Sequence, residues 1–226
     1  MKELDAVLGA PFTFASAFRR ARIFHPRGVL TQGHAELGAH WWPVQGRIPV
    51  TARLSRGIGL PGVLPDMMGL AIRLHLIGGP WDLLLVSAQL STRVVLWPAR
   101  GWSSARYSSV TAYCAEDGPA TWVFAVPDHG QPRTGSTSAL IDGGPLHFTL
   151  SLATARGKAT PAGRIWLDSP SAVADDAQPA FDPVINLPPE LRMWPEWLAT
   201  PRRTAYWASR VGRGAALPVP EAEPRA

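Results

Sequence analysis

The sequence has few cysteines, few lysines and no long hydrophobic run, and each shortage excludes a class of protein. Cys114 is the single cysteine among 226 residues, which excludes an internal disulfide and a cysteine-based metal cluster. The longest apolar stretch, around residues 83–86, is far shorter than the roughly 18 residues that span a bilayer. Glu3 and Asp5 stand where a secretory signal would carry an apolar run. A cytoplasmic protein without a membrane span is therefore the expectation.

Lysine is nearly absent, and the net charge of +5 therefore depends on arginine, whose planar group suits carboxylates and phosphates. A nucleic-acid-binding protein would gather these arginines on one element, whereas here they are scattered without a helix-turn-helix pattern. The histidines do not form a zinc-hydrolase motif, and P-loop, GxGxxG and GxSxG patterns are absent. The sequence predicts no nucleic-acid partner and disfavours a common metal- or nucleotide-dependent enzyme.

Glycine and proline together supply 44 of the 226 residues, well above the average share of about 12%. They separate short apolar segments about every ten residues, which is typical of a β-barrel or sandwich. Val50, Ala52 and Leu54 alternate with polar neighbours, as in a strand with one buried face. The predicted strands are residues 28–37, 47–55, 70–76, 81–87, 121–126, 146–153 and 164–167.

Helices are predicted on both sides of the strands. Residues 12–23 form an amphipathic pattern, and residues 188–199 and 201–213 each open with proline, which suits a first helical turn. Residues 169–179 resemble a polar linker, and the Arg-Gly-Ile-Gly-Leu-Pro-Gly stretch 56–62 is interpreted as a turn in preference to a phosphate cradle. The prediction is an α+β fold built on an antiparallel barrel with flanking helices, over residues 1–213, followed by a flexible tail, 214–226.

Four longer patterns follow one another along the chain. They are Arg22-Ile-Phe-His25-Pro-Arg-Gly28; Arg53-Leu-Ser55; the stretch 66–74 with Trp81-Asp-Leu83; and Ala180-Phe-Asp-Pro183 with Arg202, Tyr206 and Arg213. Together they resemble the catalase superfamily, whose fold is a haem-binding antiparallel β-barrel. Each pattern is weak alone, but their order from about residue 15 to residue 213 makes the resemblance specific.

The resemblance implies haem b as cofactor and Tyr206 as its iron ligand. A tyrosine bound to ferric iron is a phenolate, and its ordinary pKa of about 10 must be lowered by a nearby cation. Arg202 lies one helical turn before Tyr206, on the same face, and stays protonated. An anionic oxygen ligand disfavours ferrous haem, which suits peroxide chemistry.

Five further residues receive roles from the same resemblance. Arg22, Arg53 and Arg213 match the family's propionate-binding positions, where a guanidinium group suits a carboxylate. His25 would stand over the open face of the iron and transfer a proton between the two oxygens of a peroxide. Ser55 would hydrogen-bond His25 and fix its tautomer.

Departures from the family limit the expected activity. Val86 occupies the position where catalases carry an asparagine that polarises the peroxide, and valine cannot donate a hydrogen bond. Losing such a donor lowers the rate by about two to three orders of magnitude. Ser87 could substitute only if the strand register slipped by one residue, which would flip the side chain. The haem-stacking phenylalanine region is poorly matched, and Trp97-Pro98 is its candidate replacement.

The expectation is a minimal catalase-like haem protein that turns over hydrogen peroxide or an organic hydroperoxide in a peroxidase-type reaction, with weak or no catalase activity. A lipid hydroperoxide isomerase, similar to an allene oxide synthase, is the enzymatic alternative. A barrel that binds haem without catalysis, and a haem-free barrel, stay open. The family's interlocked tetramer need not form, and a homodimer is left open.

Overall fold

The structure of this protein is a computed structural model that describes residues 28–60, 64–172 and 179–195. Its longer strands are β1 (Gly28–Leu37), β2 (Gly46–Arg56), β3 (Met68–Leu76), β4 (Gly79–Ser87), β7 (Thr121–Pro127), β8 (Leu146–Thr154) and β9 (Thr160–Leu167). Its shorter strands are β5 (Tyr107–Ser108), β6 (Ala112–Ala115), β10 (Ser171–Ala172) and β11 (Leu191–Trp194). The described helices are the α-helix α3 (Thr137–Asp142) and the 3-10 helix η1 (Trp102–Ser104).

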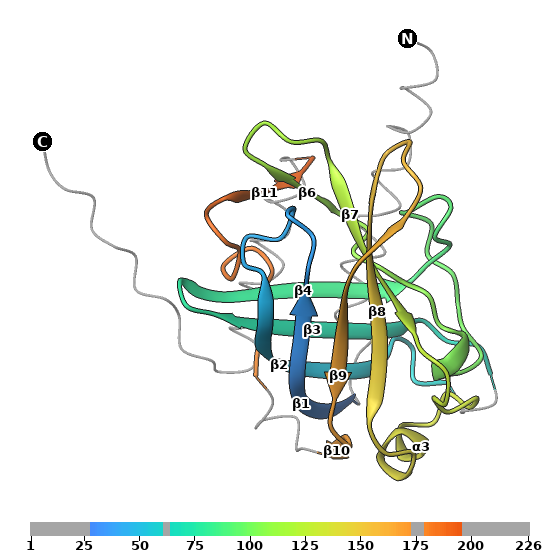
Figure 1. The fold of residues 1–226 in the computed structure, drawn as a ribbon. Coiled ribbons are helices and arrows are strands. Elements are labelled where there is room, and N and C mark those ends of the chain that lie inside the picture. The colour runs from blue at the N-terminus through green and yellow to red at the C-terminus, as the bar shows by residue number, and fades with distance from the viewer. Residues whose placement is uncertain (1–27, 61–63, 173–178, 196–226) are drawn as a thin grey trace, which may run out of the picture.

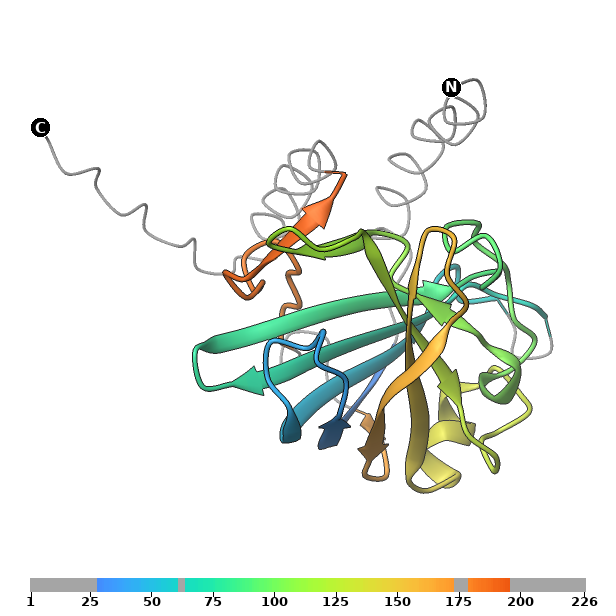
Figure 2. The same ribbon diagram turned by 45° about the horizontal axis from the view of Figure 1, so that its top comes forward.

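Eight of the strands close into an antiparallel barrel (Figure 1). Strands β1 to β4 form a meander, the ring continues from β4 through β5, β7, β8 and β9, and β9 pairs with β1. Strands β6 and β11 pair with each other and continue the sheet from β7 at one end of the barrel, which Figure 2 shows above the meander. Full closure leaves the barrel itself without an unpaired edge.

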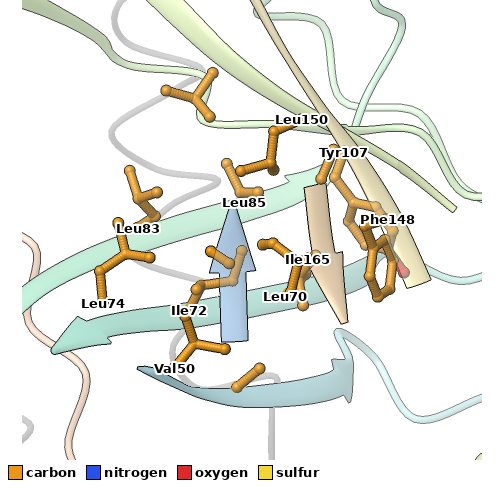
Figure 3. Close-up of a cluster of buried hydrophobic side chains, with 14 of the residues drawn as sticks. Val50, Leu70, Ile72, Leu74, Leu83, Leu85, Tyr107, Phe148, Leu150 and Ile165 are labelled. Carbon is orange, nitrogen blue, oxygen red and sulfur yellow. The ribbon is translucent and has the colours of Figure 1, made fainter. Parts of the chain in front are cut away.

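The barrel interior is filled by the alternating apolar side chains of these strands. Val50, Ala52 and Leu54 are buried on β2, as the sequence pattern predicted, while the intervening residues point outward. Leucine, isoleucine and aromatic side chains from β3, β4, β5, β8 and β9 meet them in the centre (Figure 3). The interior is therefore a packed core, and the outward faces of the strands are the surfaces left for a ligand.

Gly33 allows the barrel to close between β1 and β9. A Cβ atom at this position would lie 2.0 Å from the carbonyl oxygen of Trp166, which is closer than any real contact. The two backbones can approach this closely only because glycine has no side chain. Any other residue here would push β9 away from β1.

The seven predicted strands are all present, with bounds that differ by at most a few residues. The barrel prediction is confirmed. The prediction of flanking helices is not, because the described residues contain only α3 and η1, and the predicted helices 12–23 and 201–213 lie outside them, as does the tail 214–226.

The predicted helix 188–199 is wrong over its described part. Residues 191–194 form strand β11 and pair with β6, with Leu191 and Met193 buried and Arg192 and Trp194 exposed. This two-residue period is that of a strand, and Trp194 precedes a proline, which disfavours helical backbone. The predicted linker 169–179 likewise contains β10, which pairs with β1 at its start.

Candidate functional site

The outward face of β1 to β4 carries two rows of paired residues at one end of the barrel, which we call the outer platform. The first row is Gly28, Ser55, Gly69 and Val86, and the second is Leu30, Arg53, Ala71 and Leu84. Glycine and alanine occupy three of the eight positions, and Leu30, Leu84 and Val86 supply the larger apolar side chains. The platform is a mostly apolar strip of the sheet that carries one arginine.

Arg53 and Ser55 are brought together on this platform, as the sequence predicted for their strand. They point to the same side of β2, where Arg53 is half-buried and Ser55 is buried. A Cβ atom on Gly28 would lie 2.7 Å from the guanidinium carbon of Arg53, so the guanidinium group packs against the bare backbone of β1. Gly28 also pairs directly with Ser55.

Val86 takes the outward position of the first row, and the register leaves no room for Ser87 to replace it. Val86 pairs with Gly69 on β3 and with Ser108 on β5. The Ser87 side chain points to the opposite face, where its hydroxyl oxygen accepts a hydrogen bond from the backbone N–H of Met68 at 3.0 Å. The slipped register that would let Ser87 replace Val86 on this face therefore does not occur.

A buried ion pair stands beside the platform, in the next row of the sheet. Arg73 on β3 donates two hydrogen bonds of 2.7 Å to the two carboxylate oxygens of Asp82 on β4. The Asp82 side chain is fully buried. The hydrogen bonds to Asp82, opposed by partial burial, raise the pKa of Arg73 above its ordinary value. A paired, doubly hydrogen-bonded geometry is what makes such a buried charge tolerable.

The same ion pair anchors a segment that lies about a hundred residues later in the chain. Asp82 accepts hydrogen bonds from the backbone N–H of Asp182 at 2.6 Å and from the side-chain amide of Asn186 at 2.8 Å. Its own backbone N–H donates to the carbonyl of Asn186 at 2.9 Å. Arg73 donates to the carbonyl of Ala180 at 2.7 Å and stacks over the Phe181 ring. The third and fourth sequence patterns therefore meet in space.

Sequence reasoning did not assign Arg73 and Asn186 to this cluster. The sequence feature that could have identified Arg73 is its position relative to the β3–β4 turn. A tight turn that pairs Leu76 with Gly79 also pairs Arg73 with Asp82. Asn186 is the only asparagine of the chain. Nothing in the sequence alone showed that its amide would reach Asp82.

The glycine-rich stretch after β2 is a turn whose backbone binds an internal anion. The N–H groups of Ile58, Gly59 and Leu60 donate to the carboxylate of Asp66 at 2.8–3.1 Å. Asp66 is buried and also lies 3.4 Å from the guanidinium group of Arg56. The amides that could have cradled a phosphate are therefore occupied by the chain's own carboxylate, which supports the interpretation as a turn.

The remaining predicted site residues lie outside the described residues: Arg22, His25, Arg202, Tyr206 and Arg213. Within the described part of the chain, no group of three or more histidine, cysteine or acidic side chains could hold a metal ion. No helix among the described residues is long and apolar enough to cross a bilayer.

Catalases of known structure share this fold. A fungal catalase matches with a TM-score of 0.62 and 14% identity, over 83% of this chain and 58% of that one. Catalase A of Saccharomyces cerevisiae matches with a TM-score of 0.61 and 13% identity, over 86% of this chain and 62% of that one. A bacterial catalase gives 0.61 and 14%, over 86% and 59%.

The chain spans about three fifths of the length of these catalases. No protein-family model matches the sequence, and no curated protein does. The likeness concerns the fold, and it agrees with the order of motifs that first indicated it. The protein is a catalase-like antiparallel β-barrel.

Proposed function

We propose that this chain binds haem b on the outer platform and uses it to turn over a hydroperoxide in a peroxidase-type reaction. The observation that carries the proposal is an apolar strip of sheet, with Gly28, Gly69 and Ala71 as its small residues, beside the half-buried Arg53. A porphyrin is a flat apolar ring with two carboxylates, so it needs an apolar surface and a fixed cation. The residues present on the platform fit both needs.

The iron would be held from the C-terminal side of the chain. Tyr206 is the proposed ligand, and Arg202 would keep its phenolate charged. Arg22 and Arg213 would join Arg53 at the propionates. When bound, haem supplies a ferric centre with an open position for peroxide. The anchoring of residues 180–186 on Asp82 supports this arrangement, because it fixes the chain 20 residues before Tyr206 beside the platform.

The proposed proton transfer belongs to His25. Its imidazole would accept a proton from one oxygen of the hydroperoxide and return it to the other oxygen as the O–O bond breaks. Ser55, whose strand position pairs with Gly28, three residues after His25, would hydrogen-bond the other ring nitrogen and fix the tautomer.

The platform favours an organic hydroperoxide over hydrogen peroxide. Leu84 and Val86 present apolar side chains where a hydrogen-bond donor would polarise a small peroxide. Apolar surface instead stabilises an alkyl chain, at about 25 cal/mol per Å² buried. The same surface supports a second candidate function, the rearrangement of a lipid hydroperoxide by a hydroperoxide isomerase, in which the substrate needs no separate reductant.

A haem titration tests the proposal. We expect the purified protein to develop a high-spin ferric Soret band of the tyrosinate type, which Tyr206→Phe weakens. Arg53→Ala should lower haem affinity about tenfold or more, the value of one charged hydrogen bond. Arg47→Ala is the matched control, because Arg47 lies on the same face of β2 but is exposed at its far end. Unchanged haem affinity in Arg53→Ala, or no Soret band at saturating haem, overturns the proposal.

Turnover separates the remaining candidates once haem is bound. Consumption of cumene hydroperoxide with oxidation of an added phenol supports a peroxidase. Conversion of a fatty-acid hydroperoxide without a reductant supports the isomerase. If the protein shows a Soret band but catalyses neither reaction, it is a barrel that binds haem without catalysis. The enzymatic part of the proposal would then be wrong.

A further inference from the structure

Exposed apolar side chains gather at one end of the barrel. Four of the nine exposed large hydrophobic residues of the described chain lie in the two loops that follow β2 and β4: Ile58, Leu64, Val95 and Trp97, which we call the apolar rim. Each is between 42% and 61% exposed. Scattered single apolar residues are normal on a protein surface, whereas a set of four on two adjoining loops indicates an interaction site.

The two loops adjoin through backbone hydrogen bonds. Asp66 and Ala99 each donate an N–H to the other's carbonyl, at 3.0 and 2.9 Å. The N–H of Trp97 donates to the carbonyl of Ser87 at 3.0 Å, at the end of β4. Figures 1 and 2 both place these loops at the end of the sheet away from the β3–β4 turn. The rim is therefore one surface formed by two segments.

Hydrogen bonds hold the described parts of both loops. In the first loop, the carboxylate of Asp66 accepts the N–H groups of residues 58–60. The guanidinium group of Arg93 ties the second loop to the β8–β9 hairpin, through the carbonyl of Thr154 at 2.9 Å and that of Gly157 at 2.6 Å. Apolar side chains on fixed loops lose little conformational freedom when they dock, so the rim is suited to binding.

The exposed charged residues on the described parts of these two loops are basic. No acidic residue occurs in the sequence between Asp82 and Glu116, and Asp66, the acid of the first loop, is buried. Arg100 and Arg106 are exposed on the second loop. Exposed aromatic and aliphatic side chains beside arginines, without acids, complement the interface of an anionic bilayer, where tryptophan is favoured and basic residues face the headgroups.

We propose that the apolar rim docks the barrel on anionic lipid surfaces without crossing them. The rim adjoins the first row of the outer platform, because Ser55, Gly69 and Val86 each lie within a residue or two of the strand ends that meet these loops. A lipid hydroperoxide would thus reach the platform directly from the bilayer, a consequence that rests on the proposed function. The docking itself does not depend on haem.

Vesicle cosedimentation of the full chain without added haem tests the docking. We expect binding to phosphatidylcholine vesicles that contain phosphatidylglycerol, weaker binding to phosphatidylcholine alone, and weakening by salt. Trp97→Ser should lower the partition coefficient about tenfold or more. Ile77→Ser is its control, because Ile77 is fully exposed in the β3–β4 turn, roughly 27 Å along β3 from the rim.

The contribution of the basic residues to vesicle binding is tested with a second variant and its own control. Arg100→Ala should weaken binding to the anionic vesicles about fivefold, while Arg47→Ala at the far end of β2 should not. Each variant is checked for folding by its thermal transition.

No vesicle binding of the wild type, or an equal loss of binding in Trp97→Ser and Ile77→Ser, overturns the proposal. Concentration-dependent dimers that Trp97→Ser dissolves, without vesicle binding, would assign the rim to a second copy instead. None of these results depends on a Soret band, so this test and the test of haem binding fail separately.

Discussion

The guanidinium group of Arg73 and the carboxylate of Asp82 face each other across β3 and β4 with two nitrogen–oxygen distances of 2.7 Å, and they hold the chain at residues 180–186. The Asp82 side chain is fully buried, so water cannot stabilise its charge if Arg73 is removed. An intact buried ion pair contributes little to the net free energy of unfolding. Removing one of its partners is strongly destabilising, because the other charge is left buried without compensation.

Arg73→Met should therefore lower the free energy of unfolding by about 3–5 kcal/mol, because it leaves a buried carboxylate without its cation. Urea unfolding measures the change. The double variant Arg73→Met with Asp82→Leu should lose less than Arg73→Met alone, since the uncompensated charge is then gone. Arg47→Met, at an exposed position of the same sheet, should change the free energy by less than about 0.5 kcal/mol. A double variant as unstable as the single one would contradict this account.

Asp66→Asn should destabilise the turn after β2. The carboxylate accepts four backbone N–H groups, those of residues 58, 59, 60 and 67, and an amide would present its own N–H groups to some of these donors. We expect a loss of about 2–3 kcal/mol in urea unfolding. Asp128→Asn is the control, because Asp128 is only partly buried and accepts the Thr149 hydroxyl at its side chain. Equal effects of the two variants would show that the turn does not depend on Asp66.

Tyr107 should make the barrel sensitive to alkali. Burial raises the pKa of its hydroxyl well above the ordinary value of 10, and the hydroxyl has no hydrogen-bond partner in the described structure. The folded chain then keeps a proton that the unfolded chain releases, so the free energy of unfolding falls above about pH 10 by about 1.4 kcal/mol per pH unit. Tyr107→Phe should remove this part of the decline and be neutral or stabilising by about 1 kcal/mol at neutral pH. Parallel pH curves for the two proteins would rule out the assignment.

Val86→Asn should restore a donor on the outer platform. In the haem-loaded protein we expect hydrogen peroxide disproportionation to rise by about two orders of magnitude, measured as oxygen release, because a donor at this row polarises the peroxide. Val86→Leu should leave the low rate unchanged. If neither variant alters oxygen release, the position does not face the reacting peroxide.

The longer strands were predictable from sequence because apolar and polar residues alternate in them, as at Val50 and Arg53 on β2. That Arg53 and Ser55 share the outward face of β2 followed from the same alternation, but the neighbours that complete the outer platform on β1, β3 and β4 were not predicted. Strand β11 was missed because Pro188 suggested a helix start, while the edge of β6 that makes residues 191–194 extended lies far away in the sequence. The turn at residues 56–62 was predicted from its glycines, but nothing in the sequence showed that Asp66 would bind its backbone N–H groups. The Asp82 anchor was not predictable, because it joins residues about a hundred positions apart.

The Asp82 anchor also sets an order of assembly. Arg73 and Asp82 belong to one hairpin with a short turn, and such local contacts form within microseconds. Residues 180–186 can dock only afterwards, because they must close a loop of about a hundred residues onto a carboxylate that the hairpin has already oriented. The β1–β9 pairing that closes the barrel spans a still longer stretch, from Gly33 to Leu167. Barrel closure and the docking of residues 180–186 are therefore both expected to follow the β3–β4 hairpin, which forms first.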